Sequence, residues 1–276
     1  MSTYRDKRVL ITGGSSGIGR ALALQLAAQG AHVAIAARNP DKLDAALQEL
    51  KGAGPGGTHL AVRMDVSDKV EVEGSVPVVL EGLGGLDLLV NNAGITWPAY
   101  LNDTPTDVFE QQMQVNYLGT VYTTLAFLPH FMQQRSGHLV NVSSTLGFLG
   151  IFGYAAYAAS KFAVTGFSDC LRQDLLPYGV SVHVLFPADT DTPQHAWELE
   201  RMPAETRAIA DTAGLQSAEQ VAAATLQGIA RGEFHIVPGL MNKATWYATR
   251  FAPGLVRAIA DLDLKKAWTK RTGEKI

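Results

Sequence analysis

Tyr157 and Lys161 have the residue types and the spacing of a proton-transfer pair. On a helix, residues four positions apart lie on one face, so these two side chains would point in the same direction. A phenol with a pKa of about 10 is a poor acid–base catalyst at neutral pH. A neighbouring ammonium favours the phenolate, so we expect Lys161 to lower the pKa of Tyr157 toward the working range. The pair alone is weak evidence, because this spacing also arises by chance.

Other polar residues stand directly after apolar runs of the chain. Ser143 and Ser144 follow residues 140–142, and Asn116 lies in a helical region before them. A second group follows residues 86–90 and consists of Asn91, Asn92, Ala93 and Gly94. If these runs are parallel strands, both groups lie at the carboxyl edge of the sheet, where open α/β proteins place their sites.

A glycine-rich loop follows the first apolar run and opens the first amphipathic run. Gly13 permits a tight turn, Gly17 lets backbone approach a phosphate, and Gly19 lets the helix pack closely on the strand. The helix N-terminus would then present free N–H groups to a pyrophosphate. The predicted cofactor contacts of this loop are Thr12, Gly13, Ser15, Ser16, Gly17, Ile18 and Gly19.

The second apolar run ends at Ala37 and Arg38, which bears on the choice of cofactor. A site that binds the ribose 2′-hydroxyl of NAD needs a carboxylate at this position, and Ala37 has none. The Arg38 guanidinium instead suits the 2′-phosphate of NADP(H). This favours NADP(H) over NAD, the alternative being that Arg38 is a solvated surface residue. Asp65 and Val66 end the third run and are predicted to contact the adenine. Asp65 equally suits capping of the helix that begins near Asp68.

Seven short apolar runs alternate with amphipathic stretches along the chain. This pattern predicts an α/β fold of the Rossmann type, a doubly wound, seven-stranded parallel sheet with helices on both faces. We see no linker, so residues 1–276 are expected to form one domain. The runs are residues 9–11, 32–37, 60–64, 86–90, 140–142, 180–186 and 234–237.

Composition excludes several classes of protein. The chain of 276 residues is 47% hydrophobic and 18% charged, so it can build a core and is not disordered. A net charge of −3 gives no drive toward nucleic acid. The single cysteine, Cys170, excludes an internal disulfide and a thiolate zinc site, and we expect it in the core. The scattered histidines predict no metal site, and without a signal peptide or an 18-residue apolar run the expected location is the cytoplasm.

Two C-terminal segments need separate interpretation. Residues 189–214, the lid, carry Trp197, Met202 and Ile209, which would either line an acyl channel or pack on the sheet edge.

Residues 239–276, the tail, carry eight basic and three acidic residues, a net charge of +5. Such an amphipathic segment either lies on an anionic membrane surface, as a peripheral contact, or covers the core or a dimer surface. Its apolar face would hold Phe251, Leu255, Ile259 and Leu262, at spacings of four, four and three.

Taken together, these motifs resemble those of the short-chain dehydrogenase/reductase family over about residues 5–240. They occur in the family's order and spacing, including a serine thirteen residues before the tyrosine, which selects Ser144 over Ser143. The resemblance implies a catalytic tetrad of Asn116, Ser144, Tyr157 and Lys161. It also implies that Asn116 holds a water linking Lys161 to solvent, and that Lys161 reaches the nicotinamide ribose. Asn92, Ala93 and Gly94 are implied cofactor contacts.

Within that family the chain most resembles the 3-ketodihydrosphingosine reductase branch. The shared features are the loop at residues 187–193, residues 152–154 and 160–163, the dipeptide at residues 38–39, and residues 203–206. That branch is membrane-associated and reduces a long-chain keto-amine with NADPH. The implied cofactor contacts of the loop are Pro187, Thr190 and Thr192, while Ala188 departs from the glycine that most family members carry. Asp189 and Asp191 suit turn formation, the alternative being that one of them meets the substrate ammonium.

Two other functions stay open. One keeps the chemistry and changes the substrate to another acyl, steroid or xenobiotic ketone. The other is a non-catalytic NADP(H)-binding sensor or scaffold, against which the intact tetrad argues. Family members form homodimers or homotetramers through the tyrosine-bearing helix, and small residues there suit close contact. These are Ala155, Ala156, Ala158, Ala159, Ala163 and Gly166.

Overall fold

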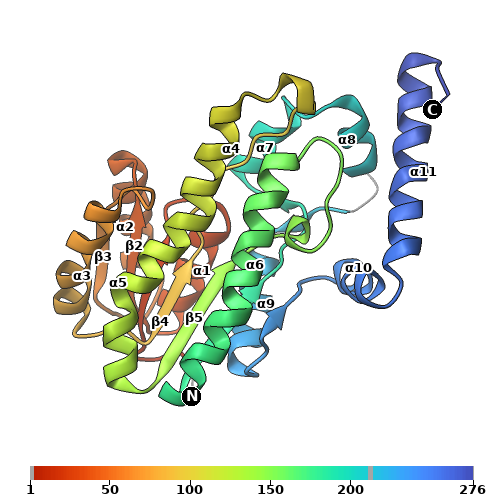
Figure 1. Cartoon of the computed structure of the whole chain (residues 1–276). Helices are drawn as coiled ribbons and strands as arrows, with labels where there is room; N and C mark the ends of the chain where they lie inside the picture. Colours follow the sequence, from red (N-terminus) through yellow and green to blue (C-terminus); the bar gives the residue numbers. More distant parts are fainter. Residues whose placement is uncertain (1–2, 211–213, 276) are drawn as a thin grey trace.

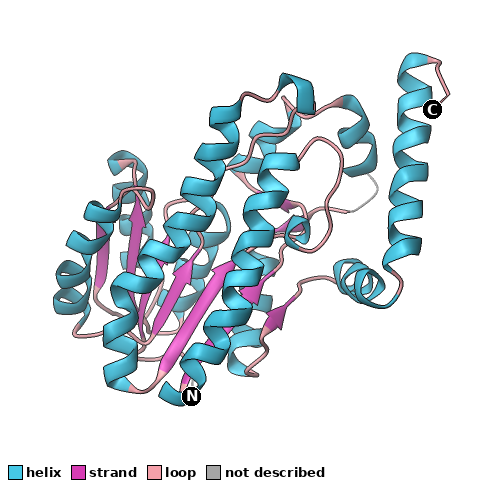
Figure 2. Cartoon of the chain, viewed as in Figure 1, coloured by secondary structure: helices cyan, strands magenta, loops and turns pink. Residues whose placement is uncertain are grey.

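The computed structural model describes residues 3–210 and 214–275. Within them, seven parallel strands form one sheet in the order β3-β2-β1-β4-β5-β6-β9 (Figure 1; Figure 2). This confirms the predicted doubly wound sheet, and the strand order reverses between β1 and β4. The strands are β1 (Arg8–Thr12), β2 (His32–Ala37), β3 (His59–Arg63), β4 (Leu88–Asn91), β5 (Gly137–Val142), β6 (Val180–Leu185) and β9 (His235–Ile236).

Helices cover both faces of the sheet. One face carries α1 (Gly17–Ala28), α2 (Pro40–Gly52) and α9 (Ala218–Ala230). The other face carries α3 (Lys69–Leu83), α5 (Gly119–Gln134) and α6 (Ala155–Leu175). Between β4 and α5 the chain forms α4 (Thr106–Gln112) and a π-helical turn, η2 (Met113–Leu118).

The strands are buried on both sides because their side chains enter two separate cores. Val9 and Ile11 pack beneath α1, whereas Leu10, between them, packs beneath α5. All three are fully buried. A run of consecutive apolar residues is therefore what a central parallel strand requires.

The lid folds over the carboxyl edge of the sheet. Its elements are β7 (Thr190–Asp191), α7 (Pro193–Leu199) and α8 (Ala204–Ala210), and β7 pairs with β8 (Gln216–Ser217). The Thr206 hydroxyl donates to the Phe152 carbonyl at 3.0 Å, and Tyr100 Oη donates to Glu205 Oε2 at 2.8 Å. Residues 211–213 of the predicted lid lie outside the described residues.

The tail forms α10 (Leu240–Phe251) and α11 (Pro253–Thr272). Trp246 anchors α10, with its ring 4.7 Å from that of Phe186, while α11 stands away from the sheet and packs against α8 (Figure 1). The predicted apolar face of the tail does not cover the core, because Phe251 and Leu255 are 84% and 62% exposed. Among the described residues, no helix is long and apolar enough to span a membrane.

The expectation that Cys170 lies in the core is wrong, because its side chain is exposed. The buried face of α6 runs through Val164, Ser168, Leu171 and Leu175. At 100° per residue, position 170 falls outside this face.

Candidate active site

The glycine-rich loop of residues 12–19, called the phosphate loop below, joins β1 to α1 at the point where the strand order reverses. Gly13 and Gly17 have φ angles of +65° and +53°, which L side chains rarely adopt. A Cβ on Gly13 would lie 3.0 Å from the backbone of Ala93, and one on Gly19 would lie 2.5 Å from the Gly13 carbonyl oxygen. The glycines are therefore required by close backbone approach as well as by conformation.

Hydrogen bonds from the β4 loop hold the phosphate loop in place. The backbone N–H groups of Asn92 and Ala93 both donate to Thr12 Oγ1 at 3.0 Å, and Asn92 Nδ2 donates to the Thr12 carbonyl at 3.0 Å. Thr12 is buried, so it acts by joining the two loops and does not line the groove.

A continuous groove runs along this edge of the sheet. It consists of two cavities of about 160 and 210 Å³ that share Gly13, Ser16, Ala93 and Gly94. Three of the predicted cofactor contacts do not line the groove, namely Thr12, Gly19 and Thr190. Two members of the predicted tetrad, Asn116 and Ser144, do not line it either. The predicted residues that line it are Gly13, Ser15, Ser16, Gly17, Ile18, Arg38, Asp65, Val66, Asn92, Ala93, Gly94, Tyr157, Lys161, Pro187 and Thr192.

One end of the groove is basic. The Arg38 guanidinium lies 3.7 Å from Asp65 and is largely exposed, and Lys42 lines the same cavity. Sequence reasoning missed Lys42, although its place one turn into the helix after Arg38 was visible. Burial opposes ionisation of Asp65, but hydrogen bonds from Ser67 and Arg38 hold the pKa of its carboxyl below the ordinary value. The cap of α3 is Asp68, not Asp65.

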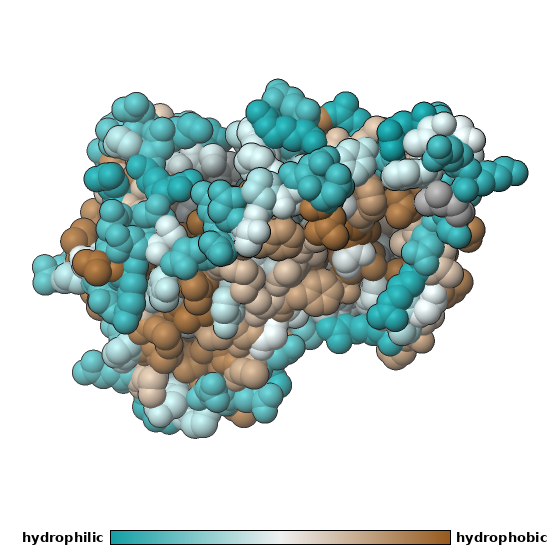
Figure 3. All heavy atoms as spheres, turned by 45° about the horizontal axis from the view of Figure 1, so that its top comes forward, coloured by the Kyte–Doolittle hydropathy of each residue, from teal (hydrophilic) through white to brown (hydrophobic). Residues whose placement is uncertain are grey.

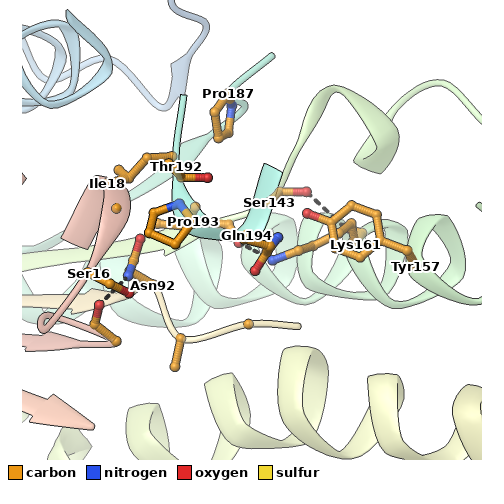
Figure 4. Close-up of a pocket in the computed structure, with 15 residues that line it drawn as sticks. Ser16, Ile18, Asn92, Ser143, Tyr157, Lys161, Pro187, Thr192, Pro193 and Gln194 are labelled. Carbon is orange, nitrogen blue, oxygen red and sulfur yellow. Dashed lines mark hydrogen bonds between the residues drawn. The ribbon is translucent and has the colours of Figure 1, made fainter. Parts of the chain in front are cut away.

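Tyr157 and Lys161 reach the other end of the groove from α6 (Figure 4). Lys161 Nζ lies 5.6 Å from the centre of the Tyr157 ring and donates to the Val142 carbonyl at 2.9 Å. Burial lowers the pKa of Lys161 to about 8. The ammonium thus stands beside the phenol at the end of β5.

The expectation that the pKa of Tyr157 is lowered is wrong for this structure. Burial raises the pKa, the negative charge of Glu198 raises it further, and the hydrogen bond with Ser144 offsets only part of this. Lys161 does not reverse the shift, because burial weakens its own charged form. The phenol is therefore protonated at neutral pH.

The two serines after β5 have different surroundings. Ser143 is buried, and its hydroxyl donates to the Lys161 carbonyl at 3.0 Å and lies 3.1 Å from Thr165 Oγ1. Ser144 instead lines a cavity together with Tyr157. The structure thus places Ser144 beside the Tyr157 phenol and Ser143 against the backbone of α6.

Asn116 lies in the π-helical turn η2, a distortion often found at functional sites. Its Oδ1 accepts from Ile95 N at 2.8 Å, and its Nδ2 donates to the Ile95 carbonyl and to Ser160 Oγ, both at 2.9 Å. A Cβ on Gly94 would lie 3.2 Å from Asn116 Oδ1 and 3.4 Å from Lys161 Nζ. Asn116 therefore joins the β4 loop to α6 next to Lys161.

A further cavity of about 190 Å³, the substrate cavity, opens beyond the phenol. Its polar wall includes Ser144, Tyr157, Asp189, His195 and Glu198. Its apolar wall includes Leu146, Ile151 and Ile209. Of the three apolar lid residues named from the sequence, Ile209 lines this cavity. Trp197 instead packs on Trp97, with ring centres 5.6 Å apart, and Met202 is buried outside the cavity.

Comparison with known proteins identifies the family. A family model described as short chain dehydrogenase matches residues 7–203. The 3-ketodihydrosphingosine reductase of Bos taurus is 40% identical over 230 residues, covering 82% of this chain and 69% of that protein. A protein of the same name from Dictyostelium discoideum is 31% identical over 302 residues, covering 97% and 90%.

Among solved structures, a short chain dehydrogenase/reductase from Burkholderia phymatum in complex with NAD superposes with a TM-score of 0.81. It is 28% identical, and the match covers 94% of this chain and 96% of that one. The chain belongs to the short-chain dehydrogenase/reductase family.

The different surroundings of the serines generate a prediction. Ser144→Ala is expected to lower kcat of the oxidoreductase reaction by about 100-fold, because a hydroxyl in this position can donate to a developing oxyanion, with little change in Tm. Ser143→Ala is expected to lower Tm more than Ser144→Ala, because it removes buried hydrogen bonds worth about 1 kcal/mol or more. Steady-state kinetics and thermal unfolding of both variants test this. A larger kcat loss in Ser143→Ala would contradict it.

Proposed function

We propose that this enzyme uses NADPH to reduce the ketone of a long-chain lipid, 3-ketodihydrosphingosine, to dihydrosphingosine. The observation that carries the proposal is the substrate cavity, which presents Tyr157 and Ser144 at one wall and apolar side chains at another. The names of the relatives from Bos taurus and Dictyostelium discoideum support the same reaction.

The groove residues fit a nicotinamide dinucleotide. The close approach of Gly13 to Ala93, and the positive φ of Gly17, leave bare backbone where a pyrophosphate needs it. Ser16, Ile18 and Asn92 lie across the cavity from Tyr157 and Lys161 (Figure 4). The bound cofactor supplies the hydride.

Proton transfer falls to the residues of this chain. Tyr157 donates its proton to the ketone oxygen as the hydride reaches carbon, while Ser144 hydrogen-bonds the same oxygen. Lys161, close to the ring, then stabilises the phenolate that remains. The raised pKa of Tyr157 keeps the phenol protonated, which is the form that reduction uses.

The basic end of the groove supports NADPH as the cofactor. Arg38 and Lys42 both line it next to Ala37, and two cations suit a 2′-phosphate. The Burkholderia phymatum structure holds NAD, so the choice of cofactor needs its own test.

Arg38→Ala is expected to raise KM for NADPH by about 10-fold or more and to leave KM for NADH nearly unchanged, because only NADPH carries the charge that Arg38 would pair with. Kinetics with both cofactors measure this, and Arg20→Ala on α1, outside the groove, serves as the control. An equal change for the two cofactors would count against NADPH preference.

The reaction itself is tested by NADPH oxidation with 3-ketodihydrosphingosine in detergent micelles. Turnover is expected with the wild type and a loss of about 1,000-fold or more with Tyr157→Phe, which keeps the ring and removes the proton. An acetoacetyl thioester and small ketones run beside it. Turnover on these alone would assign another ketone as substrate, and cofactor binding without any turnover would favour a sensor or scaffold.

We also propose that the tail rests on an anionic membrane surface as a peripheral contact of a cytoplasmic enzyme. Exposed apolar side chains along α10 and α11, Leu240, Met241, Phe251, Leu255, Ile259 and Leu262, support this. The net charge of +5 suits anionic lipid. For the homodimer or homotetramer, the exposed small residues of α6, Ala155, Ala159 and Gly166, are the candidate contact.

Vesicle co-sedimentation tests the membrane contact. We expect binding to vesicles containing phosphatidylserine, weaker binding to phosphatidylcholine alone, and about 10-fold weaker binding of Phe251→Ser/Leu255→Ser, because buried apolar area is lost. Val70→Ser, which removes an exposed apolar residue from α3, is the control. Equal binding of all three proteins would exclude the tail as the contact.

A further inference from the structure

The substrate cavity holds two carboxylates beside the catalytic phenol. We propose that Asp189 and Glu198 bind the ammonium group of an amino-ketone substrate and thereby hold its ketone against Tyr157 and Ser144. The inference rests on the proposed function and adds to it the residues that select an amine over an uncharged ketone.

Glu198 is held in a fixed position at the cavity wall. It lies on α7 and is 9% exposed. Its Oε2 accepts from Tyr154 Oη at 2.9 Å and lies 3.9 Å from His195 Nδ1. Its Oε1 is 3.4 Å from Gln194 Nε2. The Tyr154 ring lies 6.0 Å from the Tyr157 ring, so this anchor sets the carboxylate next to the reacting group.

Asp189 faces the same cavity from the chain that leads into β7. Its backbone carbonyl accepts from Gln216 N at 3.0 Å, which fixes the residue through the β7–β8 pairing. Among residues 3–210 and 214–275, neither carboxylate forms an ion pair with a lysine or an arginine. Burial raises the pKa of both carboxyls, and the neighbouring His195 offsets this only in part.

Charges that are removed from water are costly unless a partner compensates them. A ligand ammonium supplies that partner, with three N–H donors for carboxylate oxygens. In a 2-amino ketone the amine-bearing carbon is bonded to the carbonyl carbon, so the ammonium can face Asp189 and Glu198 while the oxygen faces Tyr157 and Ser144.

The rest of the cavity suits the remainder of such a substrate. Leu146, Ile151 and Ile209 give it an apolar side for an alkyl chain. Figure 3, which turns the lid end of the molecule forward, shows hydrophobic side chains gathered in the middle of this face with hydrophilic ones around them. The cavity therefore combines an acidic subsite with an apolar side.

The acidic subsite also acts on the phenol. Burial raises the pKa of Tyr157, and the charges of Glu198 and Asp189 raise it further, which makes the phenol a weaker acid. An ammonium bound between them offsets this effect, so an amino ketone eases proton transfer as well as binding more tightly. An uncharged ketone gains neither advantage.

The test compares two ketones of equal chain length, 3-ketodihydrosphingosine and its N-acetyl derivative, which has no charge. Glu198→Gln removes the charge and keeps an acceptor for Tyr154. Asp189→Asn removes the charge of the second carboxylate. Asp191→Asn, an exposed neighbour outside the cavity, is the matched control.

We expect wild type and control to favour the amino ketone in kcat/KM. Glu198→Gln and Asp189→Asn are expected to lose about 10- to 100-fold on it, as for a charge-assisted contact, and at most about 3-fold on the N-acetyl ketone. Equal losses on both ketones, no loss on either, or a wild type without preference would each overturn the inference.

A second readout separates this inference from the proposed reaction. If neither long-chain ketone is reduced, the proposed function fails. The acidic subsite is then tested by the binding of a long-chain amine. Stabilisation of wild type by dodecylamine but not by dodecanol, lost in Glu198→Gln, supports the acidic subsite. Equal thermal shifts with the amine and the alcohol overturn it.

Discussion

The reversal of strand order between β1 and β4 is the constraint on which the site depends. The chain leaves β1 toward β2 on one side and leaves β4 toward β5 on the other, so the loops after these two parallel strands flank a crevice. The Thr12 hydroxyl joins them by accepting both Asn92 N and Ala93 N. Such close backbones leave no space for a side chain at Gly13 or Gly19. The fold thus creates the crevice, and the glycines let bare backbone line it.

Desolvation governs the catalytic end of that groove. Lys161 is buried against the end of β5, where it donates to the Val142 carbonyl, and Ser143 holds its backbone from behind. The pKa of Lys161 falls and that of Tyr157 rises for the same reason, since burial penalises the charged form of each. A neutral phenol thus lies beside an ammonium whose charged form is weakened, and the Ser144 hydroxyl hydrogen-bonds the same phenol.

The sequence predicted what depends on local pattern. Consecutive apolar residues identified the strands, and the glycine spacing and the tyrosine–lysine spacing located both ends of the groove. It failed where distant segments meet. Burial raises the pKa of Tyr157, and the charge of Glu198 raises it further. Glu198 lies forty-one residues further along the chain, and its position depends on Tyr154. The exposure of Cys170 and of Phe251 likewise depends on which face of a helix packs against another element. The periodicity of the sequence predicts which residues share a face, but not which face is covered.

The lid connects the tail to the substrate cavity through a buried charge. Glu205 on α8 is almost fully buried; it accepts from Tyr100 Oη and pairs with Arg271 of α11. This pair holds the end of α11 on the lid, and the Arg271 guanidinium also lies 5.0 Å from the centre of the Trp268 ring on its own helix. A buried carboxylate that loses its cation is destabilising, which binds α8 and α11 into one unit. Ile209, which lies on the same helix α8, lines the cavity. A contact that fixes the position of the tail would therefore also affect the position of this apolar part of the cavity wall.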